Sequence, residues 1–247
     1  MKLLLLATSL ASALLVVAAT PVSRQAKPAA FFLAGDSTTA VNGGWGDGFL
    51  ATLRNGAIGQ NRGHSGATTA SFVAGGDWGK VLNLVKSNKA EYDCYVTIQF
   101  GHNDQKSTSG ISMSSFQTNL QNMANQVKSA GGTPIILTSL SRRTFTDGKL
   151  DDSLANVAQA AKKAAAAVGV TLLDLNDASK KYVQAIGPSN ADKYNLSNGD
   201  RTHINAHGTV VFGRMVADLI IDWKPALSTY ITPDAALSKK IAQGVFA

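Results

Sequence analysis

Four short polar segments hold the side chains of this 247-residue chain that could carry out chemistry together. They supply a serine hydroxyl, imidazoles, carboxylates and an amide, and they are residues 35–37, 63–67, 101–104 and 200–203. The first three follow apparent strands, and the fourth precedes an apparent helix. Ligands of open parallel sheets bind beyond the carboxyl ends of the strands, where such segments gather. Because an imidazole can activate a serine hydroxyl, this set of residues predicts nucleophilic catalysis.

The candidate nucleophile is Ser37. An apolar run, Phe31 to Ala34, breaks abruptly into Gly35-Asp36-Ser37, which predicts a buried strand followed by a tight turn. Taken alone, these three residues are also ordinary turn formers. The elements around them therefore decide whether they form a site.

The periodicity of the chain predicts strands that alternate with helices. The expected strands are 31–34, 57–63, 95–100, 134–138 and 170–175, and the expected helices are 77–87, 113–127, 151–168 and 205–223, with a short helix within 226–247. In the helix 205–223, the residues expected to pack inward are Val210, Phe212, Met215, Val216, Leu219 and Ile220. This alternation predicts βαβ units with right-handed crossovers, and hence a three-layer α/β/α sandwich around a five-stranded parallel sheet.

The N-terminus has the pattern of a secretory signal peptide. Residues 1–19 contain one lysine, an apolar core and small residues near the expected cleavage point. Residues 20–28 then form a leader, and residues 29–247 form a single domain. We therefore expect a secreted, extracellular protein whose one cysteine, Cys94, is a small buried filler. Asn195 begins the one N-glycosylation sequence, so it is a candidate glycosylation site.

The formal charge of +7 favours a polyanionic partner. The basic residues are scattered, which is unlike a nucleic-acid footprint, so no nucleic acid is expected. No apolar run after residue 19 could span a bilayer, so no membrane association is expected. An acidic cell-wall polysaccharide fits a secreted basic protein, although a basic surface that serves only solubility fits the charge equally well.

Several neighbouring residues offer alternatives. Ser65 is an alternative nucleophile, because residues 63–67 match the Gly-x-Ser-x-Gly pattern of a nucleophile elbow except at the last position. His207 follows His203 by four residues, which could indicate a metal pair, although no zinc-protease motif surrounds them. Asp36 and Asp104, and His102 beside Asn103, are interpreted as structural hydrogen-bonding residues. We assign neither Asp36 nor Asp104 a role in proton transfer.

The four segments resemble the blocks of the SGNH (GDSL-type) hydrolases, which carry Ser, Gly, Asn and His in that order. Leu-Ala-Gly-Asp-Ser-Thr, Phe-Gly-His-Asn-Asp and Asp-x-Thr-His are similar to rhamnogalacturonan acetylesterases within that family, and the similarity covers about residues 31–221. The resemblance implies a flavodoxin-like sandwich with strand order 2-1-3-4-5.

The resemblance also implies a role for each residue. Ser37 would be the nucleophile, His203 its general base, and Asp200 the carboxylate that orients the imidazole. The oxyanion hole would comprise the backbone N–H groups of Ser37 and Gly66 and the side-chain amide of Asn103. No metal and no organic cofactor is implied, and we expect a monomer.

Together these features predict a secreted serine esterase that removes O-acetyl groups from a plant cell-wall polysaccharide, acetylated pectic rhamnogalacturonan. One alternative is a broad short-chain carboxylesterase or lipase of the same fold. A second is a non-catalytic carbohydrate-binding protein, although binding alone does not require a nucleophile and a base.

Overall fold

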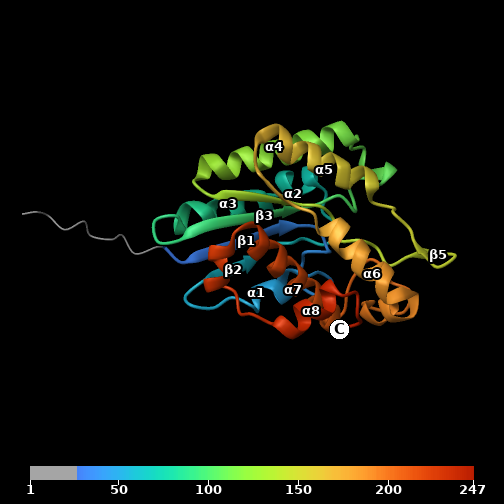
Figure 1. The fold of residues 1–247 in the computed structure, drawn as a ribbon. Helices are drawn as coiled ribbons and strands as arrows, with labels where there is room; N and C mark the ends of the chain where they lie inside the picture. Colours follow the sequence, from blue (N-terminus) through green and yellow to red (C-terminus); the bar gives the residue numbers. More distant parts are fainter. Residues whose placement is uncertain (1–26) are drawn as a thin grey trace, which may run out of the picture.

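The computed structural model describes residues 27–247, and a five-stranded parallel sheet runs through its centre (Figure 1). The strands lie in the order β2-β1-β3-β4-β7, with every neighbouring pair parallel. Their bounds are β1 Ala29–Gly35, β2 Ile58–Asn61, β3 Asp93–Gln99, β4 Thr133–Leu137 and β7 Thr171–Leu173. Since β7 is the fifth strand of this sheet, the predicted flavodoxin-like order is confirmed. The predicted signal peptide, residues 1–19, lies outside the described residues, as does the leader up to residue 26.

Helices cover both faces of the sheet, which confirms the predicted three-layer sandwich (Figure 1). One face is covered by α2 Thr69–Ala74, α3 Asp77–Asn88, α4 Met113–Ala130 and α5 Ala155–Val168. The other face is covered by α1 Gly46–Leu50, α6 Leu175–Ala191 and α7 Ala206–Trp223, with α8 Ala235–Ala242 packed on α7. Short 3₁₀ helices occur at η1 Ser107–Ser109, η2 Asp192–Tyr194 and η3 Pro225–Thr229. None of the helices in the described part of the chain is long and apolar enough to cross a membrane.

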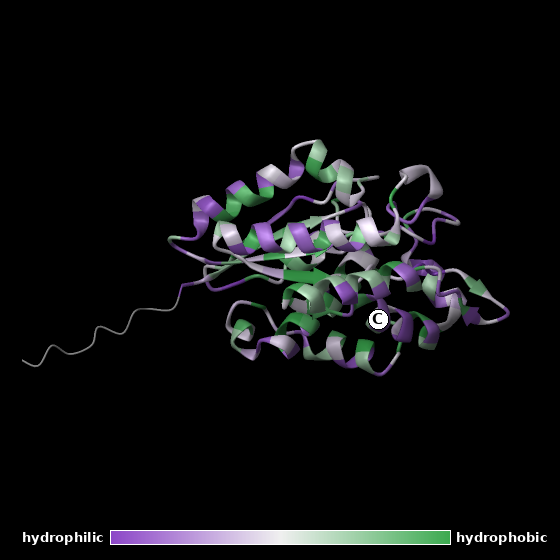
Figure 2. Ribbon diagram, turned by 90° about the horizontal axis from the view of Figure 1, so that it is seen from above, coloured by the Kyte–Doolittle hydropathy of each residue, from purple (hydrophilic) through white to green (hydrophobic). Residues whose placement is uncertain are grey.

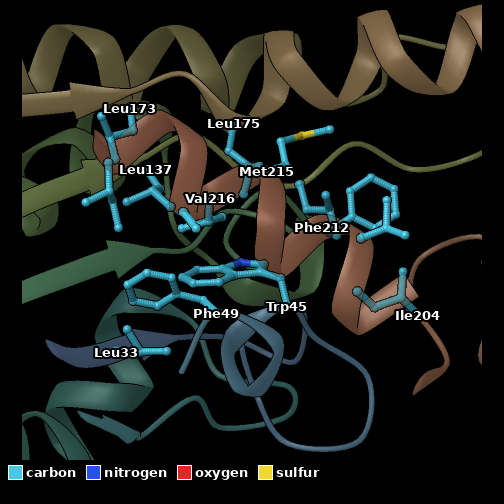
Figure 3. Close-up of a cluster of buried hydrophobic side chains, with 14 of the residues drawn as sticks. Leu33, Trp45, Phe49, Leu137, Leu173, Leu175, Ile204, Phe212, Met215 and Val216 are labelled. Carbon is cyan, nitrogen blue, oxygen red and sulfur yellow. The ribbon is translucent and has the colours of Figure 1, made fainter. Parts of the chain in front are cut away.

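Strand β1 separates two hydrophobic cores. Successive side chains of a strand point to opposite faces, so Phe31 and Leu33 enter one core while Phe32 enters the other. In the first core, Phe31 lies edge-on to Phe49 with their ring centroids 5.1 Å apart. Figure 3 shows Phe49 beside the buried Trp45. Apolar residues therefore concentrate along the central strands, where Figure 2 shows the strongest hydrophobic colouring.

Helix α4 illustrates how local signals set the bounds of an element. The Ser112 side chain accepts a hydrogen bond from Ser115 N and caps the helix start, and Gly131 ends the helix with a left-handed φ of 96°. The predicted apolar stripe is buried, and it comprises Phe116, Leu120, Met123 and Val127. The predicted helix is thereby confirmed and extends to Ala130.

Two expectations about packing and strand length are wrong. Val210 is 54% exposed, because the inward stripe of α7 runs through Val211, Phe212, Met215 and Val216, and Val210 lies beside it. Strand β7 ends at Leu173, two residues before its predicted end, because the Asp174 side chain accepts from Asp177 N and caps α6. The same capping signal marks the start of α6, a helix that is absent from the elements predicted above.

A small hairpin beyond β4 was also missed. Strands β5 Phe145–Thr146 and β6 Lys149–Leu150 pair antiparallel across Asp147 and Gly148. Both turn residues have positive φ, 49° and 76°. An Asp-Gly pair between two short strands is a recognised hairpin signal, so this element could have been predicted.

Candidate active site

Ser37 lies in a tight turn at the carboxyl end of β1. The backbone N–H groups of Thr39 and Ala40 both donate to the carbonyl oxygen of Asp36, at 3.1 Å each. A Cβ atom at Gly35 would lie 2.2 Å from the Thr39 hydroxyl oxygen and 2.7 Å from the Gln99 carbonyl oxygen. This close approach requires glycine at position 35 and fixes the direction in which the chain presents Ser37.

Asp200 and His203 belong to a loop that precedes α7. Arg143, a buried residue in the segment after β4, holds this loop in place through hydrogen bonds, and we call these contacts the brace. Its Nη2 group donates to the carbonyl oxygens of Asp200, at 3.2 Å, and His203, at 2.5 Å, and its Nε donates to Asn195 Oδ1 at 2.9 Å. Burial lowers the pKa of Arg143 to about 10, while the charges of Asp200 and Asp192 oppose that change.

The fold brings Ser37, His203 and Asp200 into one hydrogen-bonded row. Ser37 Oγ lies 2.8 Å from His203 Nε2, and His203 Nδ1 lies 2.9 Å from Asp200 Oδ2. A carboxylate only accepts, so Nδ1 carries the proton and Nε2 is left to accept from the Ser37 hydroxyl. This arrangement is able to remove the hydroxyl proton when Ser37 attacks an electrophile.

The Asp200 carboxylate is held in its ionised form. Burial raises its pKa, but hydrogen bonds from the His203 backbone N–H, the His203 ring and the Thr202 backbone N–H outweigh burial, so the pKa of Asp200 lies below its usual value. Oδ1 accepts from the N–H groups of His203, at 3.0 Å, and Thr202, at 3.1 Å. The carboxylate thus keeps its charge and its orientation toward the imidazole.

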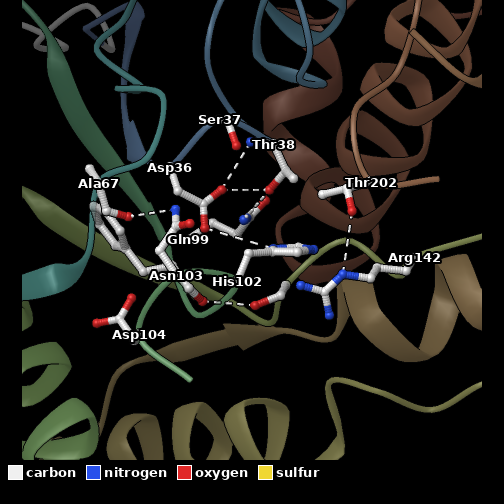
Figure 4. Close-up of polar contacts among 12 residues, drawn as sticks. Asp36, Ser37, Thr38, Ala67, Gln99, His102, Asn103, Asp104, Arg142 and Thr202 are labelled. Carbon is white, nitrogen blue, oxygen red and sulfur yellow. Dashed lines mark hydrogen bonds and ion pairs between the residues drawn. The ribbon is translucent and has the colours of Figure 1, made fainter. Parts of the chain in front are cut away.

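Three N–H donors surround the space beside Ser37. Within the described residues, the backbone N–H groups of Ser37 and Gly66 have no intramolecular acceptor. Gly66 has a φ of 79°, which turns its backbone in the left-handed region that glycine tolerates. Asn103 is largely buried, and one of its two amide hydrogens goes to Ala67 O at 3.0 Å (Figure 4). The second hydrogen is available to a ligand.

Lys106 fixes the orientation of the Asn103 amide. Its Nζ donates to Asn103 Oδ1 at 2.7 Å. The amide oxygen is therefore occupied, and the amide nitrogen is directed toward Ala67 and the pocket. No sequence pattern identified Lys106 in this role, although its spacing of three residues from Asn103 is visible in the sequence.

A polar network lies directly beneath Ser37 (Figure 4). Asp36 Oδ1 accepts from the N–H and the hydroxyl of Thr38, at 2.9 and 2.8 Å. Gln99 donates to the same hydroxyl at 2.7 Å and accepts from Trp45 Nε1 at 2.6 Å. Asp36 thus holds the loop, as predicted. Asp104 does the same for α2, because its Oδ1 accepts from the N–H and hydroxyl of Thr69.

His102 differs from its expected role. Among the described residues, neither ring nitrogen of His102 has a hydrogen-bond partner, and the residue is 2% exposed. Its nearest charged group is Asp36, whose Oδ2 lies 3.7 Å from His102 Nδ1. Burial raises the pKa of Asp36, but the interaction with His102 and the hydrogen bonds from Thr38 outweigh burial and hold that pKa below its usual value. His102 therefore acts on Asp36 rather than as a hydrogen-bonding neighbour of Asn103.

The alternative residues are engaged elsewhere. His207 packs against the rings of Tyr194 and Phe246, at centroid distances of 5.2 and 5.8 Å. His64 Nδ1 pairs with Asp77 Oδ2 at 2.5 Å. Ser65 is exposed, and no imidazole of the described residues is hydrogen-bonded to it. Across residues 27–247, no group of three or more His, Cys, Asp or Glu residues could hold a metal ion.

The pocket above Ser37 has a volume of about 240 Å³. It is lined by Ser37, Ser65, Gly66, His102, Asn103, Lys106, Arg142, Thr202 and His203. The structure thus gathers four of the predicted site residues, Ser37, Gly66, Asn103 and His203, around one cavity. Asp200 does not line it and is hydrogen-bonded to His203. Arg142, Arg143 and Lys106 were missed in the sequence. The adjacent pair of arginines four residues after a predicted strand was the available signal for Arg142 and Arg143.

Asn195, the candidate glycosylation site, is part of the loop brace. Its Oδ1 accepts from Arg143, and its Nδ2 donates to Asp192 Oδ1 at 2.9 Å. This amide therefore has a structural role in the unmodified protein.

Comparison with known proteins gives consistent relatives. Residues 33–210 match the GDSL-like lipase/acylhydrolase family. A rhamnogalacturonan acetylesterase of Bacillus subtilis, RhgT, is 32% identical over 212 residues, which are 78% of this chain and 89% of that protein.

Two crystal structures share the fold. A Bacillus subtilis protein aligns with a TM-score of 0.69 at 22% identity, covering 80% of this chain and 57% of that one. An acetylxylan esterase of Geobacillus stearothermophilus, Axe2, aligns with a TM-score of 0.58 at 16% identity, covering 80% and 94%.

Proposed function

Since the chain belongs to the GDSL-like lipase/acylhydrolase family and is therefore an ester hydrolase, we propose that it is a serine acetylesterase acting on an acidic plant polysaccharide. The substrate that we propose is acetylated pectic rhamnogalacturonan. The observation that carries the proposal is the 2.8 Å contact between Ser37 Oγ and His203 Nε2 at the base of a pocket with unpaired N–H donors.

In the proposed reaction, Ser37 Oγ attacks the acetyl carbonyl carbon while His203 Nε2 accepts its proton. The carbonyl oxygen becomes an oxyanion, which the N–H groups of Ser37, Gly66 and Asn103 stabilise. The sugar oxygen then leaves with the proton from His203, and an acetyl-enzyme remains. Water, deprotonated by His203, attacks the acetyl-enzyme, and acetate leaves as Ser37 recovers its proton. Asp200 stabilises the imidazolium in both steps.

Three observations support the proposed substrate. The relative RhgT is a rhamnogalacturonan acetylesterase at 32% identity. The chain carries a formal charge of +7, which favours a galacturonate-bearing polymer. The pocket beside Ser37 is lined almost entirely by polar side chains, which suits a glycan better than a long acyl chain.

We further propose that residues 1–19 are a signal peptide and that the mature enzyme is a secreted monomer. Mass spectrometry of the extracellular protein should find an N-terminus near residue 20, and light scattering should give the mass of one chain. Intact Met1 on extracellular protein would contradict the signal peptide.

The deciding experiment measures acetate release from acetylated rhamnogalacturonan and from acetylated xylan, beside p-nitrophenyl acetate and longer acyl esters. We expect the highest kcat/KM among polymers on rhamnogalacturonan and a steep fall with acyl length. Equal rates on butyrate and octanoate esters, with no release from polymers, would favour a broad carboxylesterase. Binding of the glycan without any turnover would favour a carbohydrate-binding protein.

A further inference from the structure

Two cationic side chains, Lys106 and Arg142, line the same pocket as Ser37 and His203. No carboxylate oxygen within residues 27–247 lies within 4.0 Å of either charged group. Six of the 21 lysines and arginines in residues 27–247 have such a partner, as in the pairs Lys80–Asp77, Lys180–Asp152, Arg201–Asp192 and Arg214–Asp218. What sets Lys106 and Arg142 apart is that both line the pocket beside Ser37. The cations beside the nucleophile are therefore left without a counter-charge.

Arg142 is held in place by neutral groups. Its Nε donates to the Thr202 hydroxyl at 3.3 Å (Figure 4), and its Nη1 donates to the Ser153 hydroxyl at 3.2 Å. With the Gln105 amide turned so that its oxygen faces Arg142, Nη1 also donates to that oxygen at 3.0 Å. These contacts orient the guanidinium without neutralising it, and no acceptor within the described residues occupies Nη2.

The charge of Arg142 is partly desolvated and has no carboxylate within 4.0 Å among the described residues. The side chain is partly buried, and this burial lowers the pKa of Arg142, while the charge of Asp36 opposes the change. Asp36 is fully buried and lies against His102. A partly desolvated cation without a direct partner costs free energy, which an anion entering from solvent would offset.

We propose that Arg142, together with Lys106, binds a uronate carboxylate of the glycan close to the acetylated sugar. This inference rests on the proposed function and identifies the acidic sugar as part of the recognised substrate. A guanidinium presents a planar set of donors that matches a carboxylate, and it keeps its charge at all relevant pH values.

The location of the two cations explains how this contact would act on the reaction. Arg142 is anchored on Thr202, the neighbour of His203, and Lys106 is anchored on Asn103. A carboxylate held between these groups would fix the sugar relative to both the proposed base and the proposed oxyanion donor. Such positioning contributes to kcat/KM for acidic glycans and not for small neutral esters.

Binding can be measured without requiring the glycan to react. Unacetylated oligogalacturonate is tested as an inhibitor of p-nitrophenyl acetate hydrolysis, and its fully methyl-esterified form serves as the matched neutral probe. In Arg142→Gln, the inhibition constant of oligogalacturonate should rise roughly tenfold or more, the usual effect of losing a hydrogen bond to a charged group. The inhibition constant of the methyl ester should not follow this rise.

The control variant is Lys86→Gln, which removes one positive charge from an exposed site on α3 outside the pocket. Its inhibition constants should equal those of the wild type. If Arg142→Gln does not fold, Lys106→Gln is measured instead. The ratio of the inhibition constants of oligogalacturonate and its methyl ester is then compared with that of the wild type, because this ratio does not depend on how fast the variant hydrolyses p-nitrophenyl acetate.

An unchanged inhibition constant in Arg142→Gln, or an equal rise for the neutral probe, would overturn the carboxylate subsite. Failure of the proposed function has a different signature, since the wild type would then release no acetate from rhamnogalacturonan. The inhibition assay still decides the subsite in that case, because it follows hydrolysis of p-nitrophenyl acetate and requires no reaction of the glycan.

Discussion

At the scale of single residues, the site depends on contacts that fix each reacting group in one orientation. Asp200 determines which nitrogen of His203 carries a proton, and Lys106 determines which end of the Asn103 amide faces the pocket. Neither orientation follows from residue type, because imidazole and carboxamide groups can each present a donor or an acceptor. Asp200 and Lys106 are therefore needed to orient His203 and Asn103, although neither is proposed to react with the substrate itself.

Replacing Ser37 with alanine should lower kcat by roughly 10⁴-fold or more, as for other serine nucleophiles. The side chain is 8% exposed and contributes one hydroxyl, so the midpoint of thermal unfolding should change little. Turnover is measured with p-nitrophenyl acetate, and the unfolding midpoint is measured by circular dichroism. Retained turnover in the folded variant would remove Ser37 from the mechanism.

Asn103→Ala should lower kcat by roughly 10²–10³-fold, which is the usual effect of losing one oxyanion donor. The variant also loses the bond to Ala67, so the unfolding midpoint is recorded alongside the kinetics. A change confined to KM would instead mean that Asn103 binds the ground state only.

At the scale of elements, the proposed catalytic residues are presented by segments that follow or precede regular structure. The turn after β1 carries Ser37, the segment after β3 carries Asn103, and the loop before α7 carries Asp200 and His203. Arg143, from the segment after β4, connects to the last of these. The relative positions of strands β1, β3 and β4 in the sheet therefore set the geometry of the site.

Arg143→Met should destabilise the protein by about 1–3 kcal/mol for each carbonyl left without a donor. Activity should fall as well, because the loop that carries His203 loses its brace. The matched control is Arg201→Met, which removes an exposed ion pair with Asp192 that solvent screens, so its free energy of unfolding should change little. Urea unfolding gives the free energy of unfolding of both variants. Equal values for Arg143→Met and Arg201→Met would contradict a stabilising role of the Arg143 hydrogen bonds.

At the scale of the whole molecule, charge connects the fold to its surroundings. The chain is basic overall, yet buried carboxylates such as Asp36 lie under the active site. Surface charge acts over the Debye length of about 8–10 Å near physiological salt, whereas buried charge is little screened. Salt and pH therefore probe different parts of the molecule.

Raising the salt concentration should lower kcat/KM for acetylated rhamnogalacturonan and leave p-nitrophenyl acetate almost unaffected. The reason is that screening weakens attraction between a basic surface and an anionic polymer. A titration with both substrates at one pH tests this. Identical salt responses would argue against a role of the basic surface in substrate binding.

The stability of the protein in acid should depend on Asp36. Its folded-state pKa lies below the value of 3.8 expected for an unfolded chain. The stabilisation that it provides is therefore complete above 3.8 and is lost as the pH falls through the lower folded-state pKa. Asp36→Asn should lack this part of the pH dependence, as measured by denaturant unfolding between about pH 2 and pH 6. An unchanged slope in the variant would assign the acid sensitivity to other groups.

The sequence by itself determined the elements whose signals are local. The apolar stripe of α4, its serine cap and its glycine end involve residues a few positions apart, and such interactions form wherever the segment lies. The alternation of strands and helices, with the preference for right-handed crossovers, similarly restricted the sheet to few topologies. Even α6 and the Asp147-Gly148 hairpin carried local signals that could have been used.

Only the tertiary structure shows which side chains meet. The resemblance had named His203, one of four histidines, as the base of Ser37, and the fold places it there across 166 positions, while His64, His102 and His207 contact other groups. Local patterns do not encode such pairings, because they depend on how strand order and loop paths bring distant segments to one sheet edge. The same reason explains why the brace of Arg143 and the unpaired charge of Arg142 became visible only in three dimensions.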